Sequence, residues 1–268
     1  MSHTRFEGLE LLTQDGIATL WLDRPAVRNA FDEHLIAEIT AAVARVAADP
    51  AVRVLVVAGR GPVFCAGADL RWMQRMATFS FDENRADALA LARMLHTLYE
   101  CPKPTIARVH GDCYAGGLGL VAACDLAVAA EGVNFCLTEV RIGLVPATIG
   151  PYVVRAIGPR AAARYMLTAE RFPATEAARL GLVHAVVAAD AIDAEVERFA
   201  AALAAGGPAA LAAAKRLIDD LAHADIDAAL LDDTAARIAA LRASPEGREG
   251  VQAVLDKRRP VWHPGGGR

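Results

Sequence analysis

A glycine-rich segment, HGDCYAGGLGLVAACD at residues 110–125, constrains the fold of this chain more than any other feature. It follows a strand-like run, Pro104 to Val109, and carries no charged residue between Asp112 and Asp125. Glycines expose backbone N–H groups and let another group approach closely. At the start of a helix, such N–H groups also form a site for negative charge. The segment therefore predicts a strand, a turn and a short helix that meets an anion, either bound or formed during a reaction.

Length and composition favour an α/β fold. The 268 residues suffice for one large domain with an appendage, and the apolar fraction of 54% combines with only 6% aromatic residues. Such a composition is typical of close-packed helices against a sheet. The net charge of −4 and the pI near 6.0 give no general attraction to nucleic acid or to an anionic membrane. The local basic run from Lys257 to Arg259 is either a solvated helix end or a contact for a phosphate or a partner.

The cysteines and the hydropathy pattern predict a cytoplasmic protein. Five scattered cysteines without a CxxC pair indicate reduced thiols rather than a disulfide framework. The N-terminus has no apolar signal segment, and no uncharged run approaches the roughly 18 residues that would suggest a membrane span. We therefore expect no membrane partner.

The order of elements predicts a spiral of ββα units followed by helices. Two strands are expected at Phe6–Leu12 and Ile17–Leu22, joined by a turn at residues 13–16. The succession of strand, turn, small-residue helix and strand then occurs twice, which favours a spiral over a flat doubly wound sheet. A helix is expected to begin at its N-cap Asp32, and a short helix over residues 174–180 is expected to end at Gly181. Beyond Asp190 only helical patterns remain. We expect residues 1–190 to form the core with the active site and residues 191–268 to form a helical oligomerisation region.

Several kinds of chemistry are disfavoured by the motifs that are missing. Only three serines occur and none lies in GxSxG, and the dispersed histidines form no metal-ligand spacing, so we predict no metal. The run Gly117 to Ala122 matches GxGxxA, with Glu139 about 20 residues on, as in dinucleotide-binding proteins. However, five residues separate Gly111 from Gly117, and the next strand begins after Asp125, too soon for a full crossover helix. A dinucleotide site is therefore disfavoured.

Two small-residue turns and one carboxylate are the candidates that remain. Backbone N–H groups at residues 66–68 and 115–117 would form an oxyanion hole if both turns pointed into one pocket. The alternative is that the small residues only allow close packing. Glu139 follows an apolar strand, where a raised proton affinity would suit acid/base catalysis, although a lone glutamate at a strand end is often merely solvated.

Taken together, these motifs resemble the enoyl-CoA hydratase/isomerase (crotonase) family, and the resemblance covers nearly the whole chain. The matching segments are FCAGADL at residues 64–70, HG…AGG…ACD at 110–125, TEVRIGLVP at 138–146, DRP…NA at 23–30, ARLGLV at 178–183 and EG…KR at 249–258. The resemblance implies a crotonase-like spiral with a C-terminal helical trimerisation region. It also implies an acyl-CoA thioester substrate, a homotrimer or a hexamer of paired trimers, and no cofactor, since coenzyme A is part of the substrate.

The resemblance also assigns roles to individual residues. The oxyanion-hole amides would be those of Ala68 and Gly116, with Glu139 as the catalytic carboxylate. Lys257 would approach the phosphates of coenzyme A from a neighbouring chain. The other residues expected to border the substrate or its coenzyme A portion are Ala26, Arg28, Ala66, Asp69, Leu70, Tyr114 and Gly117.

One departure from the family pattern leaves the reaction open. Hydratases of the family use two glutamates, and the first of these falls on Gly119 here. A single carboxylate could instead move a proton within the substrate, as the family's isomerases do. The segments GADLRWM, LTEVRIGLVPATIGPYVVRAIG and RYMLTAERF are similar to methylglutaconyl-CoA hydratases, which favours hydration of a branched or carboxylated enoyl-CoA. A third hypothesis is a non-catalytic scaffold that binds acyl-CoA or RNA, although the acidic net charge argues against RNA.

Overall fold

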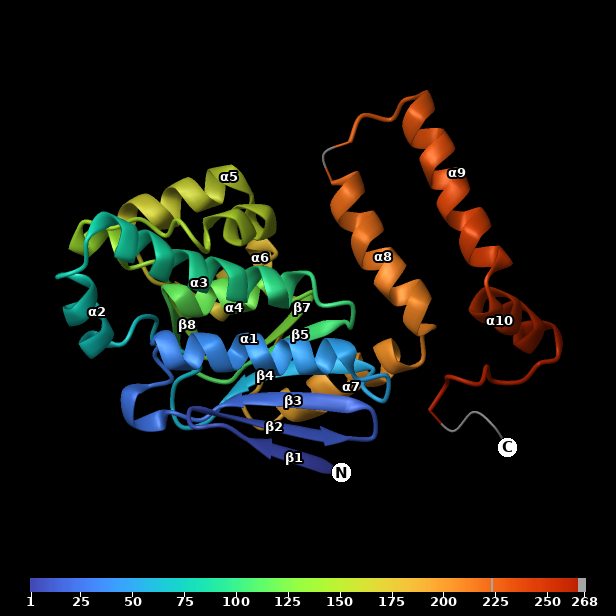
Figure 1. Ribbon diagram of the computed structural model, residues 1–268, viewed down its shortest axis with the longest axis horizontal. Helices are drawn as coiled ribbons and strands as arrows, with labels where there is room; N and C mark the ends of the chain where they lie inside the picture. Colours follow the sequence, from blue (N-terminus) through green and yellow to red (C-terminus); the bar gives the residue numbers. More distant parts are fainter. Residues whose placement is uncertain (223, 265–268) are drawn as a thin grey trace.

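A seven-stranded sheet forms the base of the molecule in the computed structural model, which describes residues 1–222 and 224–264 (Figure 1). The strand order is β1-β2-β3-β4-β5-β7-β10. The first three strands pair antiparallel, and every later pair in this sheet is parallel. The strands are β1 (Ser2–Arg5), β2 (Leu9–Gln14), β3 (Ile17–Leu22), β4 (Val54–Gly59), β5 (Thr105–Val109), β7 (Leu126–Ala130) and β10 (Ala185–Val187).

The N-terminal hairpin is confirmed, with one addition that the sequence pattern missed. Asp15 and Gly16 both have positive φ, as a tight two-residue hairpin turn requires, so the turn is narrower than the predicted residues 13–16. The predicted first strand begins later, at Leu9, because the backbone turns between Phe6 and Leu9. The added strand β1 is exposed and polar, so it carries no apolar alternation to reveal it.

A second sheet has three strands, and the segments that follow two of them begin with the candidates Gly116 and Glu139. Its order is β6 (Cys113–Tyr114), β8 (Asn134–Cys136) and β9 (Phe172–Pro173), with β6 parallel to β8 and β9 antiparallel to it. An isolated bridge between Cys65 and Cys113 links β6 to the loop that follows β4. The repeated strand-turn-helix units therefore form an α/β arrangement with two sheets, as predicted.

Helices α1 (Glu33–Ala48), α3 (Phe81–Tyr99) and α4 (Gly116–Ala123) cover one face of the large sheet (Figure 1). The predicted N-cap Asp32 is confirmed, since its side chain accepts a hydrogen bond from the Leu35 amide at 2.9 Å. Ser80 and Glu83 form a capping box at the start of α3. Helix α4 is buried along most of its length, because its glycines and alanines let neighbouring elements approach its backbone.

Helix α5 (Gly150–Thr168) bends at Gly158 and Pro159, where the backbone leaves helical geometry. Two short elements complete this part of the chain, α2 (Leu70–Met76) and α6 (Ala174–Leu180), and two 3-10 helices lie at Pro25–Val27 and Glu139–Ile142. Gly181 ends α6 in the left-handed conformation, as the sequence predicts.

The last four helices divide into one that packs on the sheet and three that extend from the body. Helix α7 (Ile192–Ala204) buries Ile192, Val196, Ala200 and Ala204 and contacts β4, β5 and β7. Helices α8 (Pro208–Leu221), α9 (Ala228–Ala243) and α10 (Pro245–Leu255) project to one side (Figure 1). The division of function at residue 190 stays a prediction. Within the described residues, none of the helices has the length and apolar character needed to cross a bilayer.

Candidate active site

The loops that follow β4 and β5 bring the two predicted turns together. In the first turn, the Phe31 amide donates to the Gly67 carbonyl at 2.7 Å, and the Asp69 amide donates to the Phe31 carbonyl at 2.8 Å. Gly67 has a φ of +92°, which glycine adopts without strain. The intervening N–H of Ala68 has no acceptor among the described residues, and Ala68 is only half-buried. This amide is therefore free to donate to a ligand.

The second turn presents another free amide at the start of α4. Ala115 has a φ of 46° and a ψ of −121°, a strained conformation for a residue with a side chain, and its amide donates to the Cys136 carbonyl at 2.9 Å. Gly116 then begins the helix. The first N–H groups of a helix have no intrahelical partner and carry the positive end of its dipole. The Gly116 amide has no acceptor within residues 1–222 and 224–264.

The two turns are in direct contact. A Cβ atom added to Gly67 would lie 2.9 Å from the Ala115 Cβ and 3.6 Å from the Gly116 nitrogen. A Cβ on Gly116 would lie 2.9 Å from an edge carbon of the Phe31 ring. Small residues are thus needed for packing here, and the same packing places both turns at one point. The two alternatives left open by the sequence are therefore compatible, because the residues that pack closely also carry the two free N–H groups.

Gly117 and Gly119 are both buried inside the protein. Gly117 is a predicted substrate contact. A Cβ at this position would lie 2.9 Å from the Cys65 Cβ, so its Cα faces the β-bridge between Cys65 and Cys113. A Cβ on Gly119 would lie only 2.4 Å from the Ile149 Cγ2. Ile149 therefore occupies the direction in which a side chain at position 119 would point. Sequence reasoning missed Ile149, which lies 30 residues further along the chain.

Glu139 has the environment expected of a catalytic carboxyl group. It begins the 3-10 helix after β8, three residues past Cys136, whose carbonyl accepts from the Ala115 amide. Its Oε2 atom is buried and has no hydrogen-bond partner among the described residues. Burial raises the pKa of this carboxyl, while its own backbone amide opposes the shift. A buried, unsatisfied carboxyl oxygen is costly for folding, and such groups are typical of functional sites.

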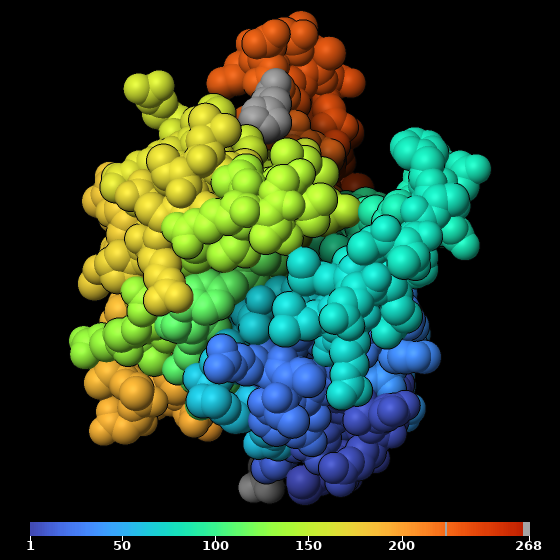
Figure 2. All heavy atoms as spheres, turned by 90° about the vertical axis from the view of Figure 1, so that its left-hand side faces the viewer, coloured from blue at the N-terminus to red at the C-terminus, as the bar shows by residue number. Residues whose placement is uncertain are grey.

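The predicted coenzyme A residues before and after β4 lie together. The Ala66 amide donates to the Arg28 carbonyl at 3.0 Å, and Ala26 is exposed in the adjacent 3-10 helix. The fully buried Asn29 fixes this arrangement, because its amide nitrogen donates to the carbonyls of Arg60, Val63 and Phe64. Figure 2 shows the face on which the segments near residues 30, 70, 115 and 145 meet.

Three further predicted residues are placed in different ways. The Asp69 carboxylate caps α2 by accepting from the amides of Arg71 and Trp72, at 2.8 and 3.3 Å. Both hydrogen bonds go to its Oδ1 atom, while Oδ2 lies 3.8 Å from the Arg24 guanidinium. Leu70 is 76% exposed beside it. The Tyr114 hydroxyl donates to the Asp112 carboxylate, and burial together with this bond raises the pKa of Tyr114 to about 12.

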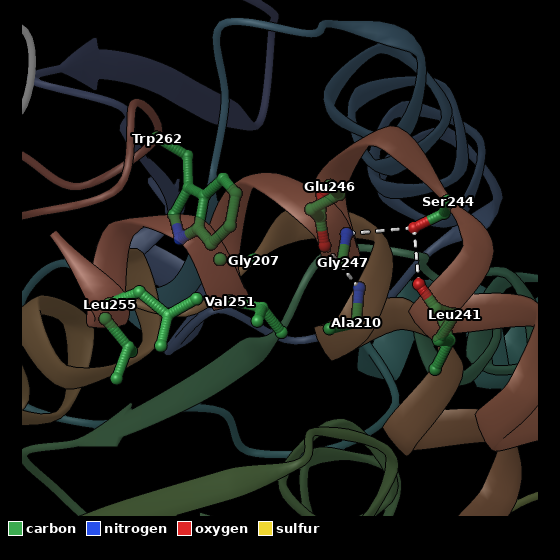
Figure 3. A pocket seen from close by; sticks show the side chains of 11 residues that line it. Gly207, Ala210, Leu241, Ser244, Glu246, Gly247, Val251, Leu255 and Trp262 are labelled. Carbon is green, nitrogen blue, oxygen red and sulfur yellow. Dashed lines mark hydrogen bonds between the residues drawn. The ribbon is translucent and has the colours of Figure 1, made fainter.

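Lys257 is exposed beyond α10, on the side of the molecule away from α2 (Figure 1). The single chain does not bring it to the other predicted residues. A cavity of about 460 Å³ near this end lies between α8, α10 and Trp262, with Leu241, Val251 and Leu255 among its walls (Figure 3). Ala68, Gly116 and Glu139 lie elsewhere. Among the described residues, we find no group of three or more His, Cys, Asp or Glu side chains placed to hold a metal ion.

The family model of enoyl-CoA hydratase/isomerase matches residues 12–265. The chain belongs to the enoyl-CoA hydratase/isomerase family. A curated member, the crotonyl-CoA hydratase of Syntrophomonas wolfei, is 32% identical over 95% of this chain and 97% of its own length. The mevalonyl-coenzyme A hydratase sidH of Aspergillus fumigatus is 34% identical over 92% of both chains.

Solved structures confirm the fold of this family member. The crystal structure of an enoyl-CoA hydratase from Shewanella pealeana superposes with a TM-score of 0.93, at 43% identity over 96% of each chain. The predicted crotonase-like α/β fold is therefore correct. The protein is an enzyme of the enoyl-CoA hydratase/isomerase family.

Proposed function

We propose that this enzyme adds water across the double bond of an α,β-unsaturated acyl-CoA. The single observation that carries the proposal is the buried Oε2 of Glu139, which has no hydrogen-bond partner among the described residues. Glu139 follows strand β8, whose Cys136 carbonyl accepts from the Ala115 amide in the turn that presents the free Gly116 amide. The names of the curated relatives support hydration.

The proposed chemistry needs only one carboxylate and two amides. Glu139 removes a proton from water as the water oxygen bonds to the β-carbon, and the electrons of the double bond move toward the thioester carbonyl. The amides of Ala68 and Gly116 donate to the resulting enolate oxygen. Protonated Glu139 then returns its proton to the α-carbon. One proton leaves the water and one enters the product, so the carboxylate is regenerated.

Burial suits Glu139 to both halves of this cycle. A raised pKa makes the carboxylate a stronger base toward water, and it leaves the acid form able to protonate the α-carbon. The proposal includes no cofactor, because coenzyme A arrives as part of the substrate. The acyl group is proposed to be branched or carboxylated, in line with the resemblance to methylglutaconyl-CoA hydratases and with the relative named for a mevalonyl thioester.

Substitution of Glu139 by glutamine tests the proposal. Glu139→Gln keeps the shape of the side chain but removes its proton-transfer capacity, so we expect loss of turnover with acyl-CoA binding retained. Turnover is followed as the loss of absorbance of a conjugated 2-enoyl thioester, and binding by calorimetry. Full activity in this variant would end the assignment of Glu139. Failure of the unchanged enzyme to hydrate any branched, straight or carboxylated 2-enoyl-CoA would end the proposal of hydration.

Isomerisation of the double bond is the second candidate, and the contact between Gly119 and Ile149 favours it. Residue 119 is glycine and so supplies no second carboxylate, and the Ile149 methyl group fills the space where a side chain at this position would point. A single carboxylate suffices to move a proton between two carbons of the substrate. Incubation with a 3-enoyl-CoA separates the two reactions, since isomerisation creates the conjugated absorbance that hydration removes.

The proposed assembly is a homotrimer or a pair of trimers, with Lys257 of one chain near the coenzyme A phosphates of another. Its support is the family resemblance and the exposed position of Lys257. The five cysteines are free thiols in the structure, which fits the cytoplasmic location that we propose.

A further inference from the structure

An exposed arginine lies beside the strand that leads into the oxyanion turn. The guanidinium carbon of Arg171 lies 5.4 Å from the centroid of the Tyr114 ring. Tyr114 precedes Gly116 by two residues, so their Cα atoms are at most about 7 Å apart. The distal end of a short acyl chain whose carbonyl meets Gly116 would cover a similar distance. Arg171 is therefore a candidate for contact with the far end of the substrate.

The turn that carries Arg171 is fixed to the catalytic strand. Helix α5 ends at Thr168, and Ala169 is left-handed with a φ of 48°. The Ala169 carbonyl accepts from Arg141 Nη2 at 2.6 Å and from the Cys136 thiol at 3.1 Å. Phe172 then pairs with Phe135 in the small sheet. Arg171 is thus anchored, on both sides along the chain, to the strand that leads to Glu139.

Cys136 lies within electrostatic range of Arg141, Arg171 and Glu139. Burial raises the pKa of the Cys136 thiol, Arg141 and Arg171 oppose this shift, and Glu139 adds to it. Arg171 also opposes the raised pKa of Tyr114. Two cations therefore act on the same short strands as the catalytic carboxylate.

Arg171 differs from its neighbours in having no carboxylate partner in the described part of the chain. Arg164 is paired with Glu170, and Arg179 with Glu176. Exposed and unpaired, the Arg171 guanidinium can take an external anion in bidentate geometry. Figure 2 shows that the segment near residue 170 lies on the same face as the segments of the site.

We propose that Arg171 determines specificity by binding a second carboxylate at the distal end of the acyl group, with Arg141 holding the turn in position. The substrate is then the monothioester of an unsaturated dicarboxylic acid. This inference rests on the proposed function, because it concerns the same site.

The test compares two substrates that differ in one charge. The probes are glutaconyl-CoA and its distal methyl ester, assayed for hydration with the unchanged enzyme and with Arg171→Gln. For glutaconyl-CoA we expect kcat/KM to fall by ~10–100-fold, mainly through KM, because a charge-assisted hydrogen bond is lost. The methyl ester should react equally well with both enzymes. Arg171→Lys should recover part of the loss, since it restores the charge without the bidentate geometry.

Arg160→Gln is the matched control, since Arg160 is exposed on α5 and has no carboxylate partner within residues 1–222 and 224–264. It should leave both substrates unaffected. An unchanged KM for glutaconyl-CoA in Arg171→Gln, or equal losses with both substrates, would overturn the inference. If the unchanged enzyme hydrates crotonyl-CoA, and its kcat/KM for glutaconyl-CoA is no higher, the role of Arg171 is refuted while the proposed function stands. If it hydrates neither, the proposed function itself fails.

Discussion

The pKa of the Glu139 carboxyl decides how the enzyme should respond to pH. Its folded-state pKa is raised above the ordinary value of 4.5, so the protonated form persists to higher pH than in an exposed glutamate. Hydration needs the ionised form as base, so kcat/KM should rise with pH along a limb centred above 4.5. A profile of kcat/KM against pH, measured at 2-enoyl-CoA concentrations below KM, reports this limb. A limb at or below 4.5 would contradict the environment that we describe for Glu139.

The same shift has a consequence for stability. Because the folded-state pKa is the higher one, the folded protein binds the proton more tightly, and its stability decreases as pH rises from 4.5 through the folded-state pKa. Glu139→Gln removes this loss, so it should raise Tm relative to the unchanged enzyme at pH 7 and much less near pH 4.5. An equal difference at both pH values would contradict this linkage.

In the proposed mechanism, Gly116 is both a packing residue and an oxyanion donor. Gly116→Ala would place a Cβ atom 2.9 Å from the Phe31 ring, which displaces the amide from the oxyanion. We expect kcat to fall by ~10²–10³, the effect of losing one such donor, with the fold retained. Adding Phe31→Leu should recover part of the loss by making room. Gly150→Ala is the control, since nothing lies within 4 Å of a Cβ there. Similar kcat values for both single variants would refute the role of Gly116.

Helix α8 depends on a side chain from another helix for its N-terminal cap. Its N-cap residue is Gly207, which has no side chain, and Glu246 of α10 accepts instead from the amides of Ala209 and Ala210, at 3.0 and 2.9 Å (Figure 3). Glu246→Ala should therefore lower the free energy of unfolding by about 1–2 kcal/mol. Glu246→Gln should cost less, because one acceptor oxygen remains. Denaturant titration measures both effects, and Glu197→Ala, at an exposed position of α7, is the control.

Elements defined by local signals could be predicted from the sequence, whereas contacts between elements could not. Asp32 and Gly181 mark helix ends through their own chemistry, so both helix ends are found where the sequence predicts them. The contact between Ile149 and Gly119 depends on how α5 packs on α4, which no spacing along the chain reveals. Likewise, the motif predicts a ligand contact for Asp69, which stays a prediction, whereas the cap that its Oδ1 atom forms on α2 was not predicted.

At the scale of the whole molecule, the last three helices leave several large apolar side chains exposed in the single chain. They include Ile218, Leu231, Ile238, Val251, Val254 and Leu255. A face of this kind is typical of a contact between subunits. The body of the protein has one continuous buried core, with separate exposed apolar side chains such as Leu70, Phe81 and Leu167. The helices α8–α10 therefore behave as one surface that we expect a second copy of the chain to cover.

Mass measurement in solution tests this expectation. Light scattering should give three or six times the chain mass of 28.3 kDa. Leu255→Asp should shift the protein to smaller species, because an unpaired charge would be buried in the contact. Leu167→Asp is the control, since Leu167 is 74% exposed on α5 and Leu255 is 70% exposed on α10. If the unchanged protein is monomeric at micromolar concentration, or if Leu255→Asp leaves its mass unchanged, the apolar surface of α8–α10 does not join subunits. If Leu255→Asp dissociates the protein and also raises KM for the acyl-CoA, each site draws on a second chain, as the proposed position of Lys257 requires.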